Sequence, residues 1–255
     1  MSESGKAHVL VTGGAQGVGR AVAERFLAAG HPVTITGRKA EALEKAAGEM
    51  GGAVHAIAAD VSVEDDVARL FEQAAEAAGP VGVLVNNAGM SGSAPLSRMS
   101  VDHFDRMMAA NARGVFLCCR AAAKPMADVG GGRIITVAST AGLKGYAYVA
   151  GYVASKHAAV GLTRALALEL AGKNITVNAI CPGFVETPMT VQTIANIVEK
   201  TGRSEEEARA ELVKFNPQKR LIETDEIADL ALWLAGPGAR SVNGQVIAID
   251  GGESA

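Results

Sequence analysis

The sequence predicts an α/β protein with a single doubly wound parallel sheet. Short apolar runs alternate with longer segments of helical period along the whole chain of 255 residues. Several of the runs are continuously apolar, as strands must be when helices cover both faces of a parallel sheet. No linker-like segment divides the chain, so we expect residues 1–255 to form one domain with helices on both faces.

Strands and helices can be assigned in order from these runs and from the residues that flank them. The expected strands are 8–13, 32–37, 53–60, 81–87, 132–139, 174–183 and 244–252. Helical period is clearest over 18–30, 63–79 and 156–172. Gly30, Gly79 and Gly172 stand where helices should end, and Ser62 and Thr224 stand where N-caps would help.

The segment 187–217 interrupts the alternation, because it has the pattern of two helices with no strand between them. Ser204 followed by Glu207 indicates a capping box that opens the second helix. Ligands of open α/β sheets bind outside the carboxyl ends of the strands, so an excursion there is expected to be a helical substrate lid. An additional surface pair of helices is the alternative.

Composition excludes several classes of function. A net charge of −3 gives no basic surplus for binding nucleic acid. No apolar run reaches the length of a membrane span, and the polar start at 1–6 does not resemble a signal peptide, so we expect a cytoplasmic protein without a membrane partner. Cys118, Cys119 and Cys181 have neither metal-ligand nor disulfide spacing, and we expect no metal site.

A glycine-rich segment, TGGAQGVGR at 12–20, joins the first strand to the first helix. Gly13 permits a tight turn, Gly17 lets the backbone approach a pyrophosphate, and Gly19 lets the helix pack closely against the strand. Unpaired N–H groups at the start of a helix favour phosphate. The segment therefore predicts a dinucleotide site, with an ordinary turn as the alternative.

The end of the second strand indicates which dinucleotide is used. NAD-specific folds place an acidic residue there, whereas this sequence has Gly37 followed by Arg38 and Lys39. Without a carboxylate nothing repels a 2′-phosphate, and the Arg38 guanidinium can pair with it. We expect NADP(H), with NAD(H) as the alternative; a solvated basic start to the next helix is the other interpretation.

Tyr152 and Lys156 lie four residues apart in an otherwise small and apolar helix, AGYVASKHAAVGL at 150–162. That spacing places both on one helix face. A phenol with a pKa near 10 is a poor acid-base group at neutral pH, and a nearby ammonium would favour the phenolate. The pair is expected to lower the pKa of Tyr152 for proton transfer.

Seven features of the chain, in order, resemble the short-chain dehydrogenase/reductase family, whose domain is Rossmann-like. They are TGGAQGVG (12–19), AADV (58–61), NNAG (86–89), Asn111, Ser139 in VAST, YVASK (152–156) and CPGFVETPM (181–189). The resemblance covers nearly the whole chain and implies an oxidoreductase that interconverts a secondary alcohol and a ketone.

The resemblance also implies roles for individual residues. Ser139 would orient the substrate oxygen, and Tyr152 would transfer the proton. Lys156 would also hold the nicotinamide ribose, and Asn111 would position a water that links Lys156 to solvent. The resemblance and the glycine motif together place the cofactor against Gly13, Gln16, Gly17, Val18, Gly19, Arg38, Asp60, Val61, Asn87, Ala88, Gly89, Tyr152, Lys156, Pro182, Gly183, Val185 and Thr187.

Three segments are expected to face the substrate: 90–96, 140–151 and the excursion after Thr187. Their larger side chains predict a mostly apolar cleft formed by Leu143, Tyr146, Tyr148, Phe184 and Met189. Only Lys144 and Gln192 could hold a free carboxylate there.

The leading hypothesis for the substrate is a 3-oxoacyl or 3-hydroxyacyl thioester, because the chain is similar to polyketide and β-ketoacyl reductases and to 3-hydroxybutyrate dehydrogenases. Cationic residues in and just after the excursion would meet the phosphates of coenzyme A or a carrier protein: Lys200, Arg203, Lys214, Lys219 and Arg220. The alternatives are a small or cyclic secondary alcohol or 3-hydroxybutyrate, with NAD, and, outside the enzymes, a non-catalytic dinucleotide-sensing scaffold.

The helices at 111–129 and 151–171 carry apolar and small residues around more of their circumference than one sheet face can cover. Such helices need a partner surface. Members of the family commonly pair these helices across a two-fold axis, and the resemblance therefore implies a homotetramer.

Overall fold

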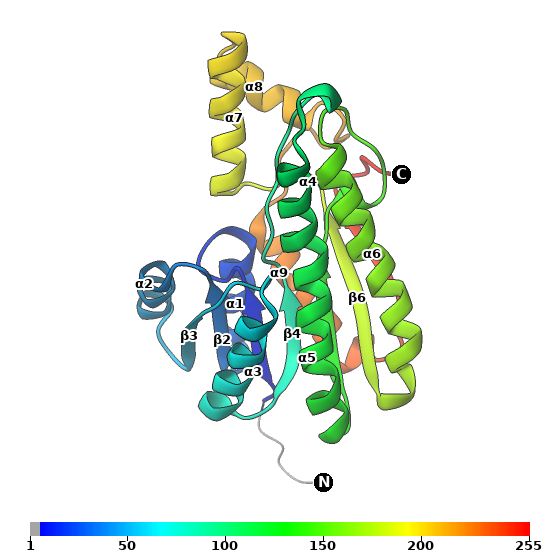
Figure 1. The fold of residues 1–255 in the computed structure, drawn as a ribbon. Coiled ribbons are helices and arrows are strands. Elements are labelled where there is room, and N and C mark those ends of the chain that lie inside the picture. The colour runs from blue at the N-terminus through cyan, green and yellow to red at the C-terminus, as the bar shows by residue number, and fades with distance from the viewer. Residues whose placement is uncertain (1–5) are drawn as a thin grey trace.

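The computed structural model describes residues 6–255, so that residues 1–5 of the polar start lie outside it. A seven-stranded, fully parallel sheet forms the centre of the molecule, with strand order β3-β2-β1-β4-β5-β6-β7 (Figure 1). The strands are β1 (His8–Thr12), β2 (Val33–Gly37), β3 (Val54–Ala58), β4 (Val81–Asn86), β5 (Gly132–Val137), β6 (Ile175–Pro182) and β7 (Val246–Ile249). The doubly wound fold predicted from the alternation is confirmed.

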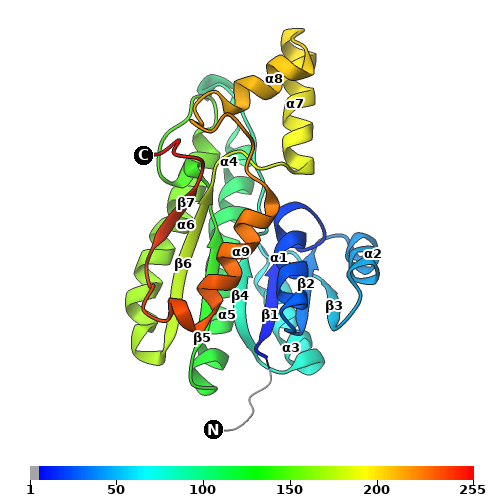
Figure 2. The same ribbon diagram turned by 180° about the vertical axis from the view of Figure 1, so that it is seen from behind.

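Helices cover both faces of this sheet, as Figures 1 and 2 show from opposite sides. They are α1 (Gly17–Ala28), α2 (Ala40–Met50), α3 (Glu64–Ala78), α4 (Val101–Met108), α5 (Gly114–Asp128), α6 (Ala150–Leu170), α7 (Pro188–Thr201), α8 (Glu205–Val213) and α9 (Thr224–Ala235). Successive strand residues face opposite cores: Val9 and Val11 pack with α1, α2 and α9, whereas Leu10 packs with α3, α5 and α6.

Two of the expected N-caps are wrong. Ser62 lies two residues before α3, where its hydroxyl and its N–H both donate to Asp60 Oδ1, at 2.7 and 2.9 Å. Thr224 is the first residue of α9, and Glu223 before it forms a capping box with Glu226. The two corrections have the same cause, a competing polar side chain nearby. Asp60 binds Ser62 in a turn, and Glu226 binds the N–H of Glu223 in the capping box.

The expected helix ends are correct at two of three glycines. Gly30 and Gly79 lie just beyond α1 and α3 and have positive φ. Gly172, in contrast, lies within a 3₁₀ turn after α6, and Asn174 supplies the left-handed residue, with φ of 56°. Asparagine tolerates that conformation, and its side-chain amide donates to Gly130 O.

The excursion consists of two helices, α7 and α8, as expected, and the Ser204–Glu207 capping box is present. A parallel bridge between Val185 and Ile222 joins its two ends. The helices stand at the end of the molecule where the strands end, above the sheet in Figure 1. No helix in the described part of the chain has both the length and the apolar character needed to cross a bilayer.

Candidate active site

The glycine loop between β1 and α1 forms a cradle that side chains would fill. Gly13 has φ of 67°, and a Cβ there would lie 2.9 Å from Asn87 Nδ2. A Cβ on Gly19 would lie only 2.3 Å from Gly13 O. Gly17 has φ of 54° and is half-buried beside the exposed Gln16. The loop therefore requires glycine at these positions, which matches a close approach of phosphate to the backbone.

Thr12 fastens this loop to the end of β4 and was missed by the sequence analysis. Its Oγ1 accepts from the N–H groups of Asn87 and Ala88, both at 2.9 Å. Asn87 completes the link, since its Nδ2 donates to Thr12 O at 2.9 Å. The Asn87 amide thus holds the glycine loop in place, and its expected role beside the cofactor ribose stays a prediction.

The second expected cofactor segment lies beside the first. A Cβ on Gly17 would lie 3.4 Å from Thr187 Cγ2, so the glycine loop and the segment 182–187 are in contact. Gly183 donates its N–H to Ile249 O at 2.9 Å, and Val185 pairs with Ile222. These contacts fix the segment after the buried Pro182 at the carboxyl end of β6. The fold thus brings the two expected cofactor segments together.

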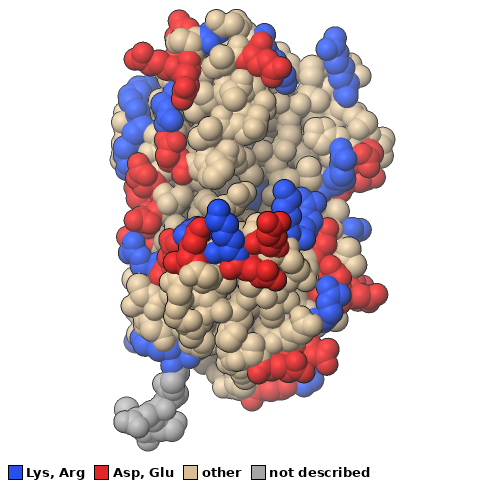
Figure 3. Space-filling model, turned by 90° about the vertical axis from the view of Figure 1, so that its left-hand side faces the viewer, with Lys and Arg blue, Asp and Glu red and all other residues tan. Residues whose placement is uncertain are grey.

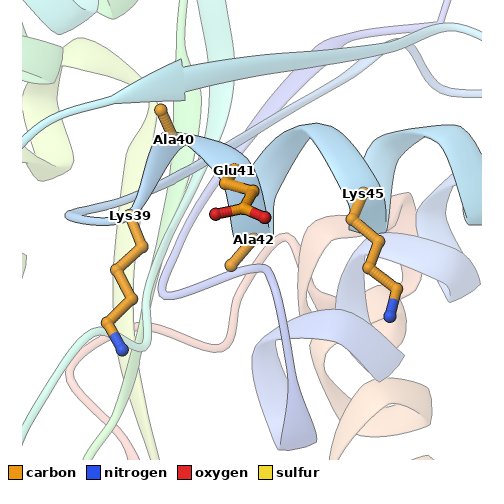
Figure 4. Close-up of a pocket in the computed structure, with 5 residues that line it drawn as sticks. All are labelled: Lys39, Ala40, Glu41, Ala42 and Lys45. Atoms are coloured by element: carbon orange, nitrogen blue, oxygen red, sulfur yellow. The ribbon is translucent and has the colours of Figure 1, made fainter.

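The residues expected at the adenosine end differ in exposure. Arg38 is exposed after β2, and within residues 6–255 it has no ion pair. Lys39 and Lys45 extend to the same side of α2 and line a surface pocket there (Figure 4). Asp60 holds Ser62, and Val61 is buried against Gly114. Lys39 also has no ion pair within residues 6–255, whereas Lys45 Nζ lies 4.0 Å from Glu49 Oε1.

Ser139 and Lys156 meet at the carboxyl end of β5. Ser139 follows the strand, and its Oγ accepts from Ala141 N at 3.1 Å. Lys156 comes from α6, where its ammonium donates to Val137 O at 3.0 Å. It is almost fully buried, and burial lowers the pKa of Lys156 to about 8. An ammonium held this way loses its proton far more readily than an exposed lysine does.

Tyr152 lies on the same face of α6, with Lys156 Nζ 5.7 Å from the centre of its ring. The expected lowering of the tyrosine pKa is wrong for the chain by itself, because burial raises the pKa of Tyr152 above its ordinary value. A hydrogen bond with Ser139 offsets part of this rise. The desolvation of the phenolate outweighs any help from an ammonium that is held by Val137.

Asn111 is buried in a π-turn, Ala109–Arg113, between α4 and α5. Its Oδ1 accepts from Met90 N at 2.9 Å, and its Nδ2 donates to Met90 O and Ser155 Oγ. A Cβ on Gly89 would lie 2.8 Å from Asn111 Oδ1 and 3.7 Å from Lys156 Nζ. The predicted residues of the segment after β4, the π-turn and α6 are therefore neighbours, and Asn111 joins the segment after β4 to α6.

The three segments expected to face substrate also meet. Ala94 donates its N–H to Tyr148 O at 2.8 Å, and Ser91 Oγ lies 3.5 Å from Met189 Sδ. Tyr148 is exposed and has φ of 66°, a strained conformation for a residue with a side chain. Phe184 and Met189 are also exposed. Apolar side chains are thus exposed where the segments converge, and uncharged residues cover the middle of the upper half of the face in Figure 3.

The two groups expected to hold a carboxylate are both engaged within the protein. Lys144 Nζ donates to Glu253 O at 3.0 Å and lies 3.1 Å from Glu253 Oε1. Gln192 donates its amide to Asn196 Oδ1 at 3.1 Å. The Tyr146 hydroxyl is also engaged, since it donates to Glu253 Oε1 at 2.6 Å. Lys144 is neutralised by Glu253, and Gln192 and Tyr146 carry no charge, so these residues do not provide the free cation that a carboxylate substrate needs.

Most of the cations in and just after the excursion are paired as well. Glu211 pairs with both Arg203 and Lys214, and Glu226 pairs with Arg220. Lys219 donates to the backbone oxygen of Lys214. Of the five cations expected to meet phosphates, only Lys200 has no such partner within residues 6–255. The expected basic patch is therefore largely neutralised by acidic neighbours.

The cysteines are buried small residues, as expected, and burial raises the pKa of Cys119 to about 12. In residues 6–255 no group of three His, Cys, Asp or Glu side chains is arranged to hold a metal ion. The doubly wound sheet, the glycine cradle at its first strand, and Ser139, Tyr152 and Lys156 at its carboxyl edge define an oxidoreductase of the dinucleotide-binding α/β class.

The family follows from comparison with known proteins. The family model for short chain dehydrogenases matches residues 7–197, and the chain belongs to the short-chain dehydrogenase/reductase family. The chain is 35% identical to a D-beta-hydroxybutyrate dehydrogenase of Rhizobium meliloti over 252 residues, which cover 96% of this chain and 98% of the relative. This membership identifies the protein as an oxidoreductase.

Solved structures agree with this assignment. An actinorhodin polyketide ketoreductase variant with NADPH superposes with a TM-score of 0.94 at 35% identity, over 98% of this chain and 97% of that one. A 3-ketoacyl-(acyl-carrier-protein) reductase from Brucella melitensis, complexed with NADH, has a TM-score of 0.89 at 33% identity, over 98% and 99%. Relatives with either nicotinamide cofactor thus share the fold.

Proposed function

We propose that this enzyme reduces an uncharged 3-oxoacyl compound, an ester or thioester, to the secondary alcohol with NADP(H). The observation that carries this proposal is the pairing of Lys144 with Glu253, which leaves the segment 140–151 without a free cation for a substrate carboxylate. A free 3-hydroxy acid fits less well, because a buried carboxylate without a cationic partner is strongly disfavoured. A cytoplasmic location stays a prediction.

The glycine cradle and the segment 182–187 would hold the cofactor, which when bound supplies the hydride. Ser139 would donate a hydrogen bond to the carbonyl oxygen and so fix the face that is reduced. Tyr152 would give its phenolic proton to the same oxygen as the alcohol forms. A high tyrosine pKa suits an acid in this direction, since it keeps the proton on the phenol until charge develops on the substrate.

Lys156 would replace that proton from solvent and hold the nicotinamide ribose. With a pKa of about 8, its ammonium can release and regain a proton near neutral pH. Asn111 has its amide group bound to Met90 and Ser155, so a water beside Lys156 would be held by the Asn111 backbone carbonyl. A π-turn shifts the backbone hydrogen bonds by one residue and can leave such a carbonyl available.

The cofactor preference gives the first testable prediction. Arg38 is an exposed cation without an ion pair in the described residues, and a hydrogen bond to a charged phosphate contributes about 1.5–3 kcal/mol. Replacing Arg38 by Asp should therefore raise KM for NADPH by about 10- to 100-fold and lower KM for NADH. Steady-state kinetics with both cofactors measures the change.

The matched control is Arg240→Asp, which makes the same charge change at an exposed position beyond α9. It should leave both KM values near those of the wild type. An Arg38→Asp enzyme that keeps its preference for NADPH would show that Arg38 is only a solvated cation at the start of α2.

A small or cyclic ketone is the second candidate substrate. The ion pairs of the cations in and just after the excursion favour it, because such a substrate has no phosphate to bind. Coenzyme A and carrier-protein phosphates need free cations, whereas Arg203, Lys214 and Arg220 each face an acidic side chain. Comparing an acetoacetyl thioester of coenzyme A with ethyl acetoacetate and a cyclic diketone distinguishes the candidates. Clearly higher kcat/KM for the thioester supports the first, and turnover of the cyclic diketone alone supports the second.

The homotetramer gives the second prediction. Phe116 on α5 and Leu168 on α6 expose apolar side chains, Leu168 by 84%, on the helices expected to pair. Light scattering at micromolar concentration should give about four times the 26.0 kDa chain mass, and Leu168→Glu should lower it. Lys124→Glu changes an exposed polar position on α5 as the control. A wild-type protein of 26.0 kDa would contradict the prediction.

A further inference from the structure

One acidic side chain outside the expected catalytic set is buried beside the substrate-facing segments. Glu253 belongs to the chain segment after β7. This segment and the C-terminus lie at the end of the molecule that also carries α7 and α8 (Figures 1 and 2). Its side chain is only 3% exposed. A carboxylate this deeply buried needs compensating partners, because the loss of its hydration is costly.

The partners of the Glu253 side chain within residues 6–255 belong to the loop that follows Ser139. The Tyr146 hydroxyl donates to Glu253 Oε1 at 2.6 Å and lies 2.8 Å from Thr140 Oγ1. Lys144 Nζ lies 3.1 Å from the same carboxylate oxygen, over the face of the Tyr146 ring. Glu253 therefore holds the loop at two side chains and neutralises the cation that this loop carries.

The backbone that carries Glu253 is itself fixed. Asp250 is buried and accepts from Gly252 N at 3.0 Å and from Ser254 N at 2.9 Å. Gly251, with φ of 65°, packs so closely on Asn216 that a Cβ would lie 2.1 Å from Asn216 Oδ1. These contacts define the turn around Glu253, so its carboxylate needs little reordering to hold the loop.

The other oxygen of the carboxylate faces the expected cofactor segment. A Cβ on Gly183 would lie 3.6 Å from Glu253 Oε2, so Gly183 leaves room for the acidic group. Glu253 thus stands between the loop that follows Ser139 and the segment expected to hold the nicotinamide. A change in the charge of Glu253 would therefore alter the electrostatic surroundings of both the loop and this segment.

We propose that Glu253 is a positioning residue that sets the charge preference of the site. It holds Tyr146 and Lys144 in place, and by pairing with Lys144 it makes the enzyme select carbonyl compounds that carry no free carboxylate. The inference rests on the proposed function, since it names the residue that would exclude acidic substrates. Glu253 acts through the loop and does not itself touch the reacting atoms.

Glu253→Gln and Glu253→Ala separate the neutralisation of Lys144 from the positioning of the loop. Glu253→Gln keeps an oxygen that can accept from Tyr146 but removes the charge that neutralises Lys144. It should raise the ratio of kcat/KM for acetoacetate to that for ethyl acetoacetate by about three- to tenfold. Adding Lys144→Met should return the ratio to the wild-type value. Glu64→Gln, which breaks an exposed ion pair with Arg120, should leave it unchanged.

Glu253→Ala removes both carboxylate contacts, leaves Lys144 only its bond to the Glu253 backbone oxygen, and so tests the positioning itself. Hydrogen–deuterium exchange in the segment 140–146 should become faster in Glu253→Ala but stay close to wild type in Glu253→Gln. A merely structural residue would lower kcat/KM for both substrates alike and leave their ratio unchanged, which would overturn the charge preference. Unchanged exchange in Glu253→Ala would overturn the positioning role.

The same data separate this inference from the proposed function. A wild-type enzyme that reduces neither ethyl acetoacetate nor acetoacetyl-CoA would contradict the proposed function. The exchange comparison does not depend on turnover, so it would still decide whether Glu253 holds the loop.

Discussion

Replacing Tyr152 by Phe is expected to lower kcat for ketone reduction by about a thousandfold, within the range that general acids contribute. The substitution removes the only proton donor proposed for the carbonyl oxygen and keeps the ring that packs beside Lys156. Cofactor binding should change little, so the Kd for NADPH, measured by fluorescence, should stay within about threefold of wild type. Steady-state kinetics and a fluorescence titration on the same preparations measure both quantities.

Tyr148→Phe is the matched control, because it removes a phenol hydroxyl from an exposed residue of the adjoining loop. It should retain most of the wild-type kcat. A Tyr152→Phe enzyme with near wild-type kcat would show that the proton comes from elsewhere. Equal losses in both variants would show that the loop geometry, and not the Tyr152 proton, limits the reaction.

Replacing Lys156 by Met is expected to lower kcat by at least about a hundredfold and, in the same protein, to increase stability at pH 7. Burial lowers the pKa of Lys156 from 10.5 to about 8, which corresponds to about 3 kcal/mol of destabilisation when the lysine is charged. Removing the ammonium leaves Val137 O without its donor, which costs about 1 kcal/mol. The net gain should be about 2 kcal/mol.

The pH dependence of this gain has a definite sign. In the unfolded chain Lys156 keeps its proton up to its ordinary pKa of 10.5, whereas in the folded protein it loses the proton near pH 8. Between these values the unfolded state binds more protons, so wild-type stability from this group rises with pH. The advantage of Lys156→Met is therefore complete below pH 8 and disappears as the pH approaches 10.5.

Urea denaturation of both proteins at pH 7 and pH 10 measures the difference. Contributions from other titrating groups cancel when the variant is compared with the wild type at each pH. A gain that is the same at pH 7 and pH 10 would show that Lys156 carries no burial cost. A loss of stability at pH 7 would mean that the bond to Val137 outweighs that cost.

The sequence was sufficient to predict the fold because the signal repeats along the whole chain. A continuous apolar run such as 81–85 must be covered on both of its faces, and the structure has helices on both faces of the sheet. Helix ends were less predictable. Ser62 and Glu223 show why: a cap depends on which of several neighbouring polar groups reaches the free N–H, and the order of residues does not decide that.

The candidate site could be predicted only where it consists of short motifs. The glycine loop and the Tyr152–Lys156 pair are local in the sequence, and the fold brings them to the same edge of the sheet. Glu253 lies more than a hundred residues from Tyr146, and no spacing connects them. The raised pKa of Tyr152 was also beyond prediction, because it depends on burial.

The most direct test of the central claim is nicotinamide absorbance during incubation of the wild-type enzyme and Tyr152→Phe with NADPH and ethyl acetoacetate or acetoacetyl-CoA. The account predicts rapid NADPH oxidation by the wild type with at least one of these substrates and almost none by the variant. Unchanged NADPH with both, and with a broad panel of other ketones, would contradict the claim that this site reduces carbonyl compounds.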